Sequence, residues 1–126
     1  MDDMKEKLST LWIFIMFNIV MADIIGNMEP GALKAMMTGD VGFKVTSEIM
    51  LVFSVIQEVP IAMIVLSRVL KYKANRLANI IAGVITIVYV IGGGEPILSY
   101  FFFATMEVLC ALLIIWYAWK WAKPEE

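Results

Sequence analysis

Four long apolar runs follow one another along the chain, and each is close to the length of a membrane-crossing helix. They cover residues 8–28, 45–70, 75–91 and 97–121. A transmembrane helix needs about 20 mostly apolar residues, because each residue adds ~1.5 Å and the hydrocarbon core is ~30 Å thick. The pattern predicts an all-α fold, a four-helix transmembrane bundle that forms one integral membrane domain over residues 1–126.

The segment between the first two runs is too short and too interrupted to span a membrane. Pro30 can begin a helix in this segment and Gly39 can end it. Leu33, Met36 and Met37 follow the helical spacing of three and four residues. We therefore expect a short interfacial helix on the membrane surface, with an ordered loop as the alternative. A tight turn is expected at residues 92–96, GGGEP.

The distribution of charge orients the bundle. Lysine and arginine gather near both termini and in the link KYKANR, residues 71–76, whereas the two opposite links are richer in acids. Those opposite links hold Lys34 and Lys44 against Glu29, Asp40, Glu48 and Glu95. The positive-inside rule then places both termini in the cytoplasm. The four tryptophans are expected at the cytoplasmic interface: Trp12, Trp116, Trp119 and Trp121.

The composition excludes several classes of protein. Hydrophobic residues make up 61% of the chain, and a soluble domain is closer to half apolar. The net charge is only −2, so no nucleic-acid partner is expected. The chain has one cysteine and no histidine, which argues against an internal disulfide, a CxxC redox centre and the common transition-metal sites. We expect no cofactor and no metal.

Three acids lie inside the apolar runs: Asp23, Glu58 and Glu107. A charged acid at the bilayer centre costs a few kcal/mol, so such a residue needs a partner or a cavity. Glu58 lies ~18 Å and Glu107 ~15 Å from the outer ends of their spans, which puts both near the midplane. Asp23 lies about 7 Å nearer the outer face than the midplane. The acids are therefore the best candidates for a functional site.

Polar and small residues form stripes that are expected to face the bundle axis. The stripe with Glu58 is Ser47, Leu51, Ser54, Glu58 and Ala62; that with Glu107 is Tyr100, Ala104, Glu107, Ala111 and Ala118; the third run has Asn75, Asn79, Gly83 and Thr86. We expect a midplane ligand-binding pocket lined by Glu58, Glu107, Asp23, Asn18 and Gln57, with no catalytic residue. The alternative for these side chains is internal hydrogen bonding that only holds helices together.

Pro60 follows Glu58 closely in the second run. Because proline has no backbone N–H, it leaves the carbonyl of Ile56 without its helical donor. That carbonyl could contribute to a site beside Glu58, as in broken membrane helices, or Pro60 could simply kink the helix.

Several segments resemble a family of small prokaryotic four-span membrane proteins of unknown function. They are LSTLWIFIMFN and AD in the first run, EPG after it, and EVPIAMIVLSRVLKYKANRLANIIAG. The chain is also similar in outline to DoxX-like four-helix membrane proteins. The first resemblance implies a four-span inner-membrane protein and supplies no reaction. Some DoxX-like proteins are associated with thiol or quinone redox work. This chain lacks the cysteine pairs that such work would use.

Three functions fit these observations. The first is binding or transport of a small cationic or apolar ligand in the pocket, by a protein expected to be a homodimer in the lipid bilayer. The second is a structural or accessory membrane subunit whose polar residues only pin helices. The third is an enzyme, such as an acid/base isomerase of a lipid-like substrate, although no nucleophile motif supports it.

Overall fold

The fold is a bundle of four long helices with a fifth, short helix across one end. The computed structural model describes residues 3–39, 46–93 and 97–122, and within these ranges the regular elements are helices. They are α1 (Asp3–Gly26), α2 (Ala32–Thr38), α3 (Ser47–Val69), α4 (Tyr72–Gly92) and α5 (Leu98–Lys120). All but α2 are long and apolar enough to cross a membrane. The predicted four spans and the short helix after the first span are confirmed.

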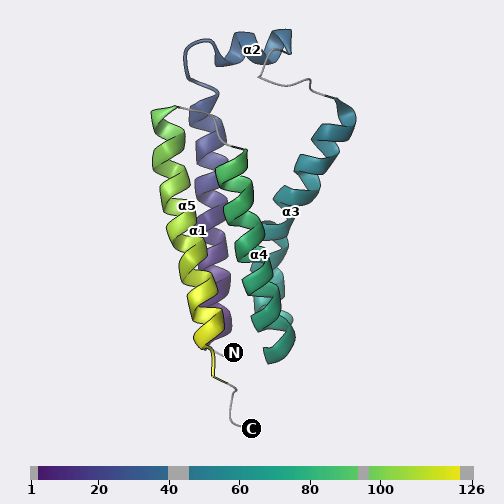
Figure 1. Ribbon diagram of the computed structural model, residues 1–126, viewed down its shortest axis with the longest axis vertical. Coiled ribbons are helices and arrows are strands. Elements are labelled where there is room, and N and C mark those ends of the chain that lie inside the picture. Colours follow the sequence, from purple (N-terminus) through teal and green to yellow (C-terminus); the bar gives the residue numbers. More distant parts are fainter. Residues whose placement is uncertain (1–2, 40–45, 94–96, 123–126) are drawn as a thin grey trace.

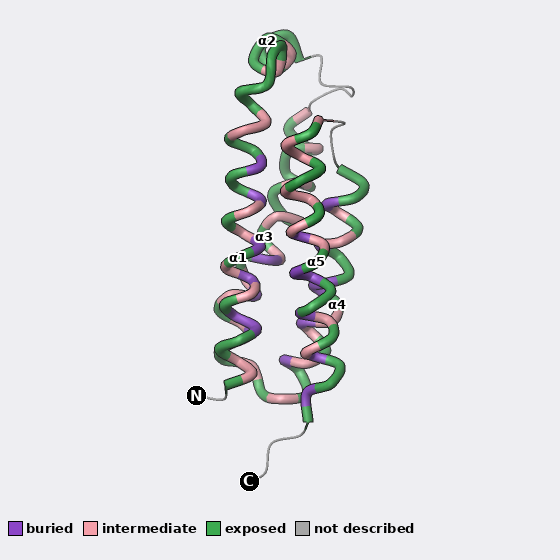
Figure 2. The backbone as a smooth tube through the Cα atoms, turned by 90° about the vertical axis from the view of Figure 1, so that its left-hand side faces the viewer, coloured by how far each residue is buried: buried purple, intermediate pink, exposed green. Residues whose placement is uncertain are grey.

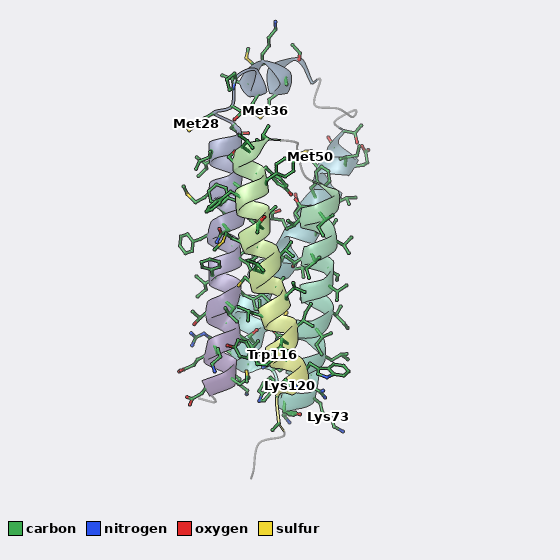
Figure 3. The ribbon with its side chains drawn as sticks, turned by 60° about the vertical axis from the view of Figure 1, so that its left-hand side comes forward. Met28, Met36, Met50, Lys73, Trp116 and Lys120 are labelled. Carbon is green, nitrogen blue, oxygen red and sulfur yellow. The ribbon has the colours of Figure 1, made fainter. Side chains whose placement is uncertain are left out.

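The four long helices form a ring. The extensive contacts join α1 to α3, α3 to α4, α4 to α5 and α5 to α1 (Figure 1). We call the two ends of the bundle the α2 end and the terminal end, where α1 begins and α5 finishes. Figure 3 shows Met28, Met36 and Met50 toward the α2 end, and Trp116, Lys120 and Lys73 toward the terminal end.

Helix α3 buries side chains against the bundle over its second half only. Thr46 caps its start by accepting a hydrogen bond from the N–H of Ile49 (3.1 Å). Its buried residues are Pro60, Met63 and Ser67, so none precedes the proline. Figure 1 shows the first half of α3 standing away from the other long helices. Because Pro60 interrupts the backbone hydrogen bonding at that point, the helix can diverge there. The bundle is therefore closed toward the terminal end and open toward the α2 end.

The core lies mainly toward the terminal end, where buried positions are most frequent (Figure 2). Leu8, Trp12, Ile15 and Ile114 are all fully buried. The expectation of an interfacial Trp12 was therefore wrong. Its indole N–H donates to Oδ1 of Asn79 at 2.7 Å, and this bond lets the polar edge of the ring enter the core.

Small residues let α4 and α5 approach closely. A Cβ atom at Gly83 would lie 2.7 Å from Cγ1 of Ile115, closer than packed carbons come. Ala111 and Ala118 are fully buried. The small-residue stripe predicted for the fourth span therefore does face the bundle.

The short helix α2 ends where the sequence predicted. Gly39 adopts a left-handed conformation (φ 75°), and its N–H donates to the carbonyl of Met36 at 3.4 Å. Leu33, Met36 and Met37 are exposed, so an apolar surface is left uncovered at this end. Other expectations fall outside the described residues: the start of the second span at Val45, the last part of the turn at 92–96, and the charges of Asp40, Lys44, Glu95 and Lys123.

Candidate ligand-binding cavity

A small cavity lies in the half of the bundle nearer the α2 end, the half from which α3 diverges. Its volume is about 60 Å³. Helices α1, α4 and α5 line it with Ile19, Ala22, Asp23, Tyr89, Val90, Gly93, Tyr100 and Glu107. Two acids are thus brought together there, and the lining includes no basic side chain.

Glu107 is the buried acid of the cavity. It is only 2% exposed, and its Oε2 atom has no hydrogen-bond partner among the described residues. Thr86 on α4 is 3% exposed, and its Oγ1 is equally without a partner there. Two contacts fix the register of the antiparallel helices α4 and α5: Gly83 packs beside Ala111, and the hydroxyl of Tyr100 donates to the carbonyl of Val90. In this register Thr86 and Glu107 lie at one level. A polar group left unsatisfied in an apolar interior is costly, so a hydrogen bond to either atom would lower the free energy of this region.

Two tyrosines present oxygen lone pairs to the cavity. The hydroxyl of Tyr89 donates to Oε1 of Gln57 at 3.0 Å, and that of Tyr100 donates to the backbone carbonyl of Val90. Each phenol has one proton, and both protons are already used. The ring of Tyr89 is further held edge-on by Phe53, with centroids 6.5 Å apart. The two hydroxyls can therefore accept hydrogen bonds from a ligand but not donate to it.

Asp23 stands nearer the α2 end than Glu107. Two contacts set the register between α1 and α5. Gly26 lies beside Ile97 near one end of the two helices, and further along them the thiol of Cys110 donates to the carbonyl of Leu11 (3.4 Å). In this register Asp23 lies close to Tyr100, about two turns from Glu107. Asp23 is exposed, unlike Glu107. This arrangement agrees with a rim position for Asp23 and an inner position for Glu107.

Glu58 does not join the cavity, and its expected inward orientation was wrong. It is exposed, as are Ser54 and Leu51 on the same stripe. The buried face of α3 passes through Pro60, and a residue two positions away points about 160° from that face. The sequence indicated a polar stripe correctly but could not show which side of α3 packs. Of the three acids inside the spans, Glu107 alone is buried.

Asn18 and Gln57 are half-buried and do not line the cavity. The side-chain amide of Asn18 donates to the carbonyl of Phe14 in its own helix at 2.8 Å. Gln57 reaches the site indirectly, through its bond to Tyr89. Tyr89, by contrast, lines the cavity, although the sequence analysis did not single it out.

A second polar cluster, toward the terminal end, is fully bonded at its centre. Oδ1 of Asn79 accepts from Trp12 (2.7 Å) and Ser67 (3.3 Å). Its Nδ2 donates to the carbonyl (2.8 Å) and to Oδ1 (2.6 Å) of Asn75. Asn79 thus makes every hydrogen bond that an amide side chain can make. We call Trp12, Ser67, Asn75 and Asn79 the asparagine cluster.

Residues of the link KYKANR tie helix ends together. Asn75 donates to the carbonyls of Ser67 (2.7 Å) and Leu70 (3.2 Å), which α3 leaves unsatisfied where it ends. Arg76 donates to the carbonyls of Ala118 (2.9 Å) and Trp119 (3.0 Å) at the end of α5. These bonds give the link KYKANR a structural role.

Among the residues that the structure describes, no three His, Cys, Asp or Glu side chains form a group suited to a metal ion. Comparison with known proteins adds a family but no activity. No curated protein and no solved structure matches the chain, so the DoxX-like outline is not confirmed. One family described as a "Family of unknown function" matches residues 1–126. The chain therefore belongs to this family, DUF6326, as its resemblance to an uncharacterised family of small membrane proteins predicted.

Proposed function

We propose that the protein binds a small cation in the cavity at Glu107, as a step in moving that cation into or across the membrane. The observation that carries this proposal is the buried Oε2 atom of Glu107, which has no hydrogen-bond partner among the described residues. An acid in this state is costly in a membrane interior unless a proton or a cation neutralises it.

The chemistry of the lining favours a cation over an anion. Glu107 and Asp23 bring carboxyl groups, and the hydroxyl protons of Tyr89 and Tyr100 are directed to other acceptors. The polar side chains of the cavity therefore mostly offer oxygen lone pairs. Such a surface matches ammonium, a primary amine or a hard metal cation, all of which need oxygen acceptors.

The size of the cavity limits the ligand. Its volume of about 60 Å³ is less than half that of a ~150 Å³ cavity that holds one benzene molecule. An ammonium ion, a methylammonium ion or a sodium ion with one water fits this space, whereas a sterol-like or isoprenoid-like substrate does not. The positive-inside prediction would place the Asp23 rim toward the cell exterior, so the proposed entry is from outside.

Binding can be tested with the purified protein and a matched pair of variants. The thermal unfolding temperature is measured in detergent micelles against sodium, potassium, ammonium and methylammonium chlorides at constant ionic strength. A cation that binds only the folded protein raises this temperature, and the shift grows with the logarithm of the cation concentration above its Kd. Glu107→Gln removes the charge in the cavity, and Glu58→Gln makes the same chemical change on the exposed face of α3.

We expect at least one of the cations to stabilise the wild type and Glu58→Gln, and none to stabilise Glu107→Gln. The same pattern is expected for uptake of that cation into proteoliposomes. The proposal fails if Glu107→Gln retains the full cation-dependent shift. It also fails if all three proteins respond equally to every salt, because the effect would then be nonspecific.

A further inference from the structure

The exposed face of α3 has an acid at its centre, away from the cavity. Glu58 is exposed, and five residues within two turns of it are also exposed: Leu51, Ser54, Val55, Ile61 and Val65. At comparable depths the exposed faces of the other long helices present Phe17, Val88 and Leu109. Hydrocarbon suits those side chains but not the carboxyl group of Glu58.

Helix α3 is also the least covered of the four spans. Only 11% of its most apolar 18-residue stretch is buried, against 33% for α1 and α4 and 22% for α5. Closing the first half of α3 onto the cavity would not cover Glu58, because that residue points about 160° from the packed face at Pro60. The described part of the chain therefore offers no group that covers Glu58, and a second molecule can supply one.

The exposed face has the spacing of a coiled-coil seam. Leu51, Glu58 and Val65 are seven residues apart, as are Ser54 and Ile61 on the adjoining row. Repeats of seven align one helix with another along a shared seam, and one polar residue in such a seam fixes register and number of helices. Ser54 adds a small side chain that permits close approach.

We propose that this face is the interface between two copies of the chain, with Glu58 hydrogen-bonded to Glu58 of the second copy. Two copies inserted with the same orientation are related by a twofold axis along the membrane normal. That symmetry makes the two α3 helices parallel and sets identical residues at the same depth. Two carboxyl groups that meet on this axis can share a proton in one hydrogen bond.

Cysteine cross-linking in native-like vesicles tests this interface. Cys110, the chain's one cysteine, is replaced by alanine, and Val65→Cys is introduced on the seam. The matched control is Ile81→Cys on α4. The bond between Tyr89 and Gln57 sets the register of α3 against α4 and puts residues 65 and 81 at nearly equal depth. Both side chains are exposed, 60% for Val65 and 50% for Ile81.

With copper phenanthroline as oxidant, we expect disulfide-linked dimers for Val65→Cys and little for Ile81→Cys. Adding Glu58→Leu should lower the dimer yield roughly three- to ten-fold, since interhelical polar contacts have that weight in membranes. Glu58→Gln should retain the dimer, because an amide also donates and accepts. Single-molecule photobleaching of the labelled wild type, diluted in lipid, should give two steps.

Equal cross-linking at the two cysteines, one-step photobleaching, or an unchanged yield with Glu58→Leu would overturn the interface. Because Glu58 is exposed on α3, the helical circular-dichroism spectrum of the Glu58→Leu variant should match that of the wild type, which shows that the fold is intact. These outcomes are independent of cation binding at Glu107, which the thermal shift measures separately.

Discussion

The two halves of the bundle treat buried polar groups in opposite ways. Toward the terminal end, the asparagine cluster makes every hydrogen bond available to Asn79. Toward the α2 end, Oε2 of Glu107 and Oγ1 of Thr86 are buried without partners among the described residues. Both groups of residues are polar interruptions in apolar helices, so the sequence presents them alike. What separates them is whether their bonds are made inside the protein.

This difference suggests a division of roles. A satisfied polar cluster in a membrane interior joins helices in one arrangement, because its groups would be exposed to hydrocarbon if the helices separated. An unsatisfied group gains by meeting a ligand or a proton. Helix α3 contributes to both roles. Its second half packs on the asparagine cluster through Ser67, and its first half leaves the cavity side of the bundle open.

The largest effect is expected at the centre of the asparagine cluster. Asn79→Ala should lower the free energy of unfolding by about 3 kcal/mol, because it leaves the indole N–H of Trp12 and the Oδ1 atom of Asn75 buried without partners. Reversible unfolding with SDS in mixed micelles measures this change. Asn18→Ala is the control, since Asn18 bonds only its own helix, and it should cost no more than about 0.5 kcal/mol. Equal losses would contradict the comparison.

The second effect concerns the contact between α4 and α5 that both halves share. Gly83→Ala should lower the free energy of unfolding by about 1.5 kcal/mol, because the added Cβ would meet Cγ1 of Ile115, a branch carbon that cannot move alone. Gly92→Ala in the same helix meets nothing within 4 Å and should be neutral or slightly stabilising. The same unfolding assay compares the two. If both changes were neutral, the close approach of α4 and α5 would be in doubt.

In the cavity, removing a polar group should raise the free energy of unfolding instead of lowering it. Glu107→Leu replaces a buried acid without a partner for Oε2 by an apolar side chain of similar size, and should raise the free energy of unfolding by about 1 kcal/mol in the absence of ligand. The cation-dependent thermal shift should be lost in the same variant. If Glu107→Leu lost as much stability as Asn79→Ala, Glu107 would hold the helices together, and the proposed ligand site would be contradicted.

The sequence was informative about elements and less so about faces. Residues 8–28, 45–70, 75–91 and 97–121 were predicted as spans, and the helices match them within five residues at each end. Apolar length alone determines these elements, because a membrane requires continuous backbone hydrogen bonding. The short helix between the first two spans was also found, from the spacing of Leu33, Met36 and Met37 and from Gly39.

The face of α3 could not be predicted because it depends on which neighbours α3 meets. The stripe through Ser54 and Glu58 is polar, and polarity alone favoured the bundle axis, but the packed face is that of Pro60, Met63 and Ser67. In a membrane, lipid and protein interior are both apolar, so hydrophobicity does not distinguish the two sides. For the same reason Trp12 was expected at the interface, although Asn79 accepts its N–H inside the core. Long-range partners decide both cases.

The smallest effects offer the sharpest comparison, because they change one hydroxyl in each half. Ser67→Ala removes a donor to Asn79, at 3.3 Å, and should lower the free energy of unfolding by about 0.6 kcal/mol. Thr86→Val removes a buried hydroxyl that has no partner among the described residues, while keeping the shape, and should raise it by about 0.5 kcal/mol. Reversible unfolding with SDS should show a lower free energy of unfolding for Ser67→Ala and a higher one for Thr86→Val. If both variants lost stability, Thr86 would have to be bonded within the folded protein, and the cavity half would be as satisfied as the terminal half.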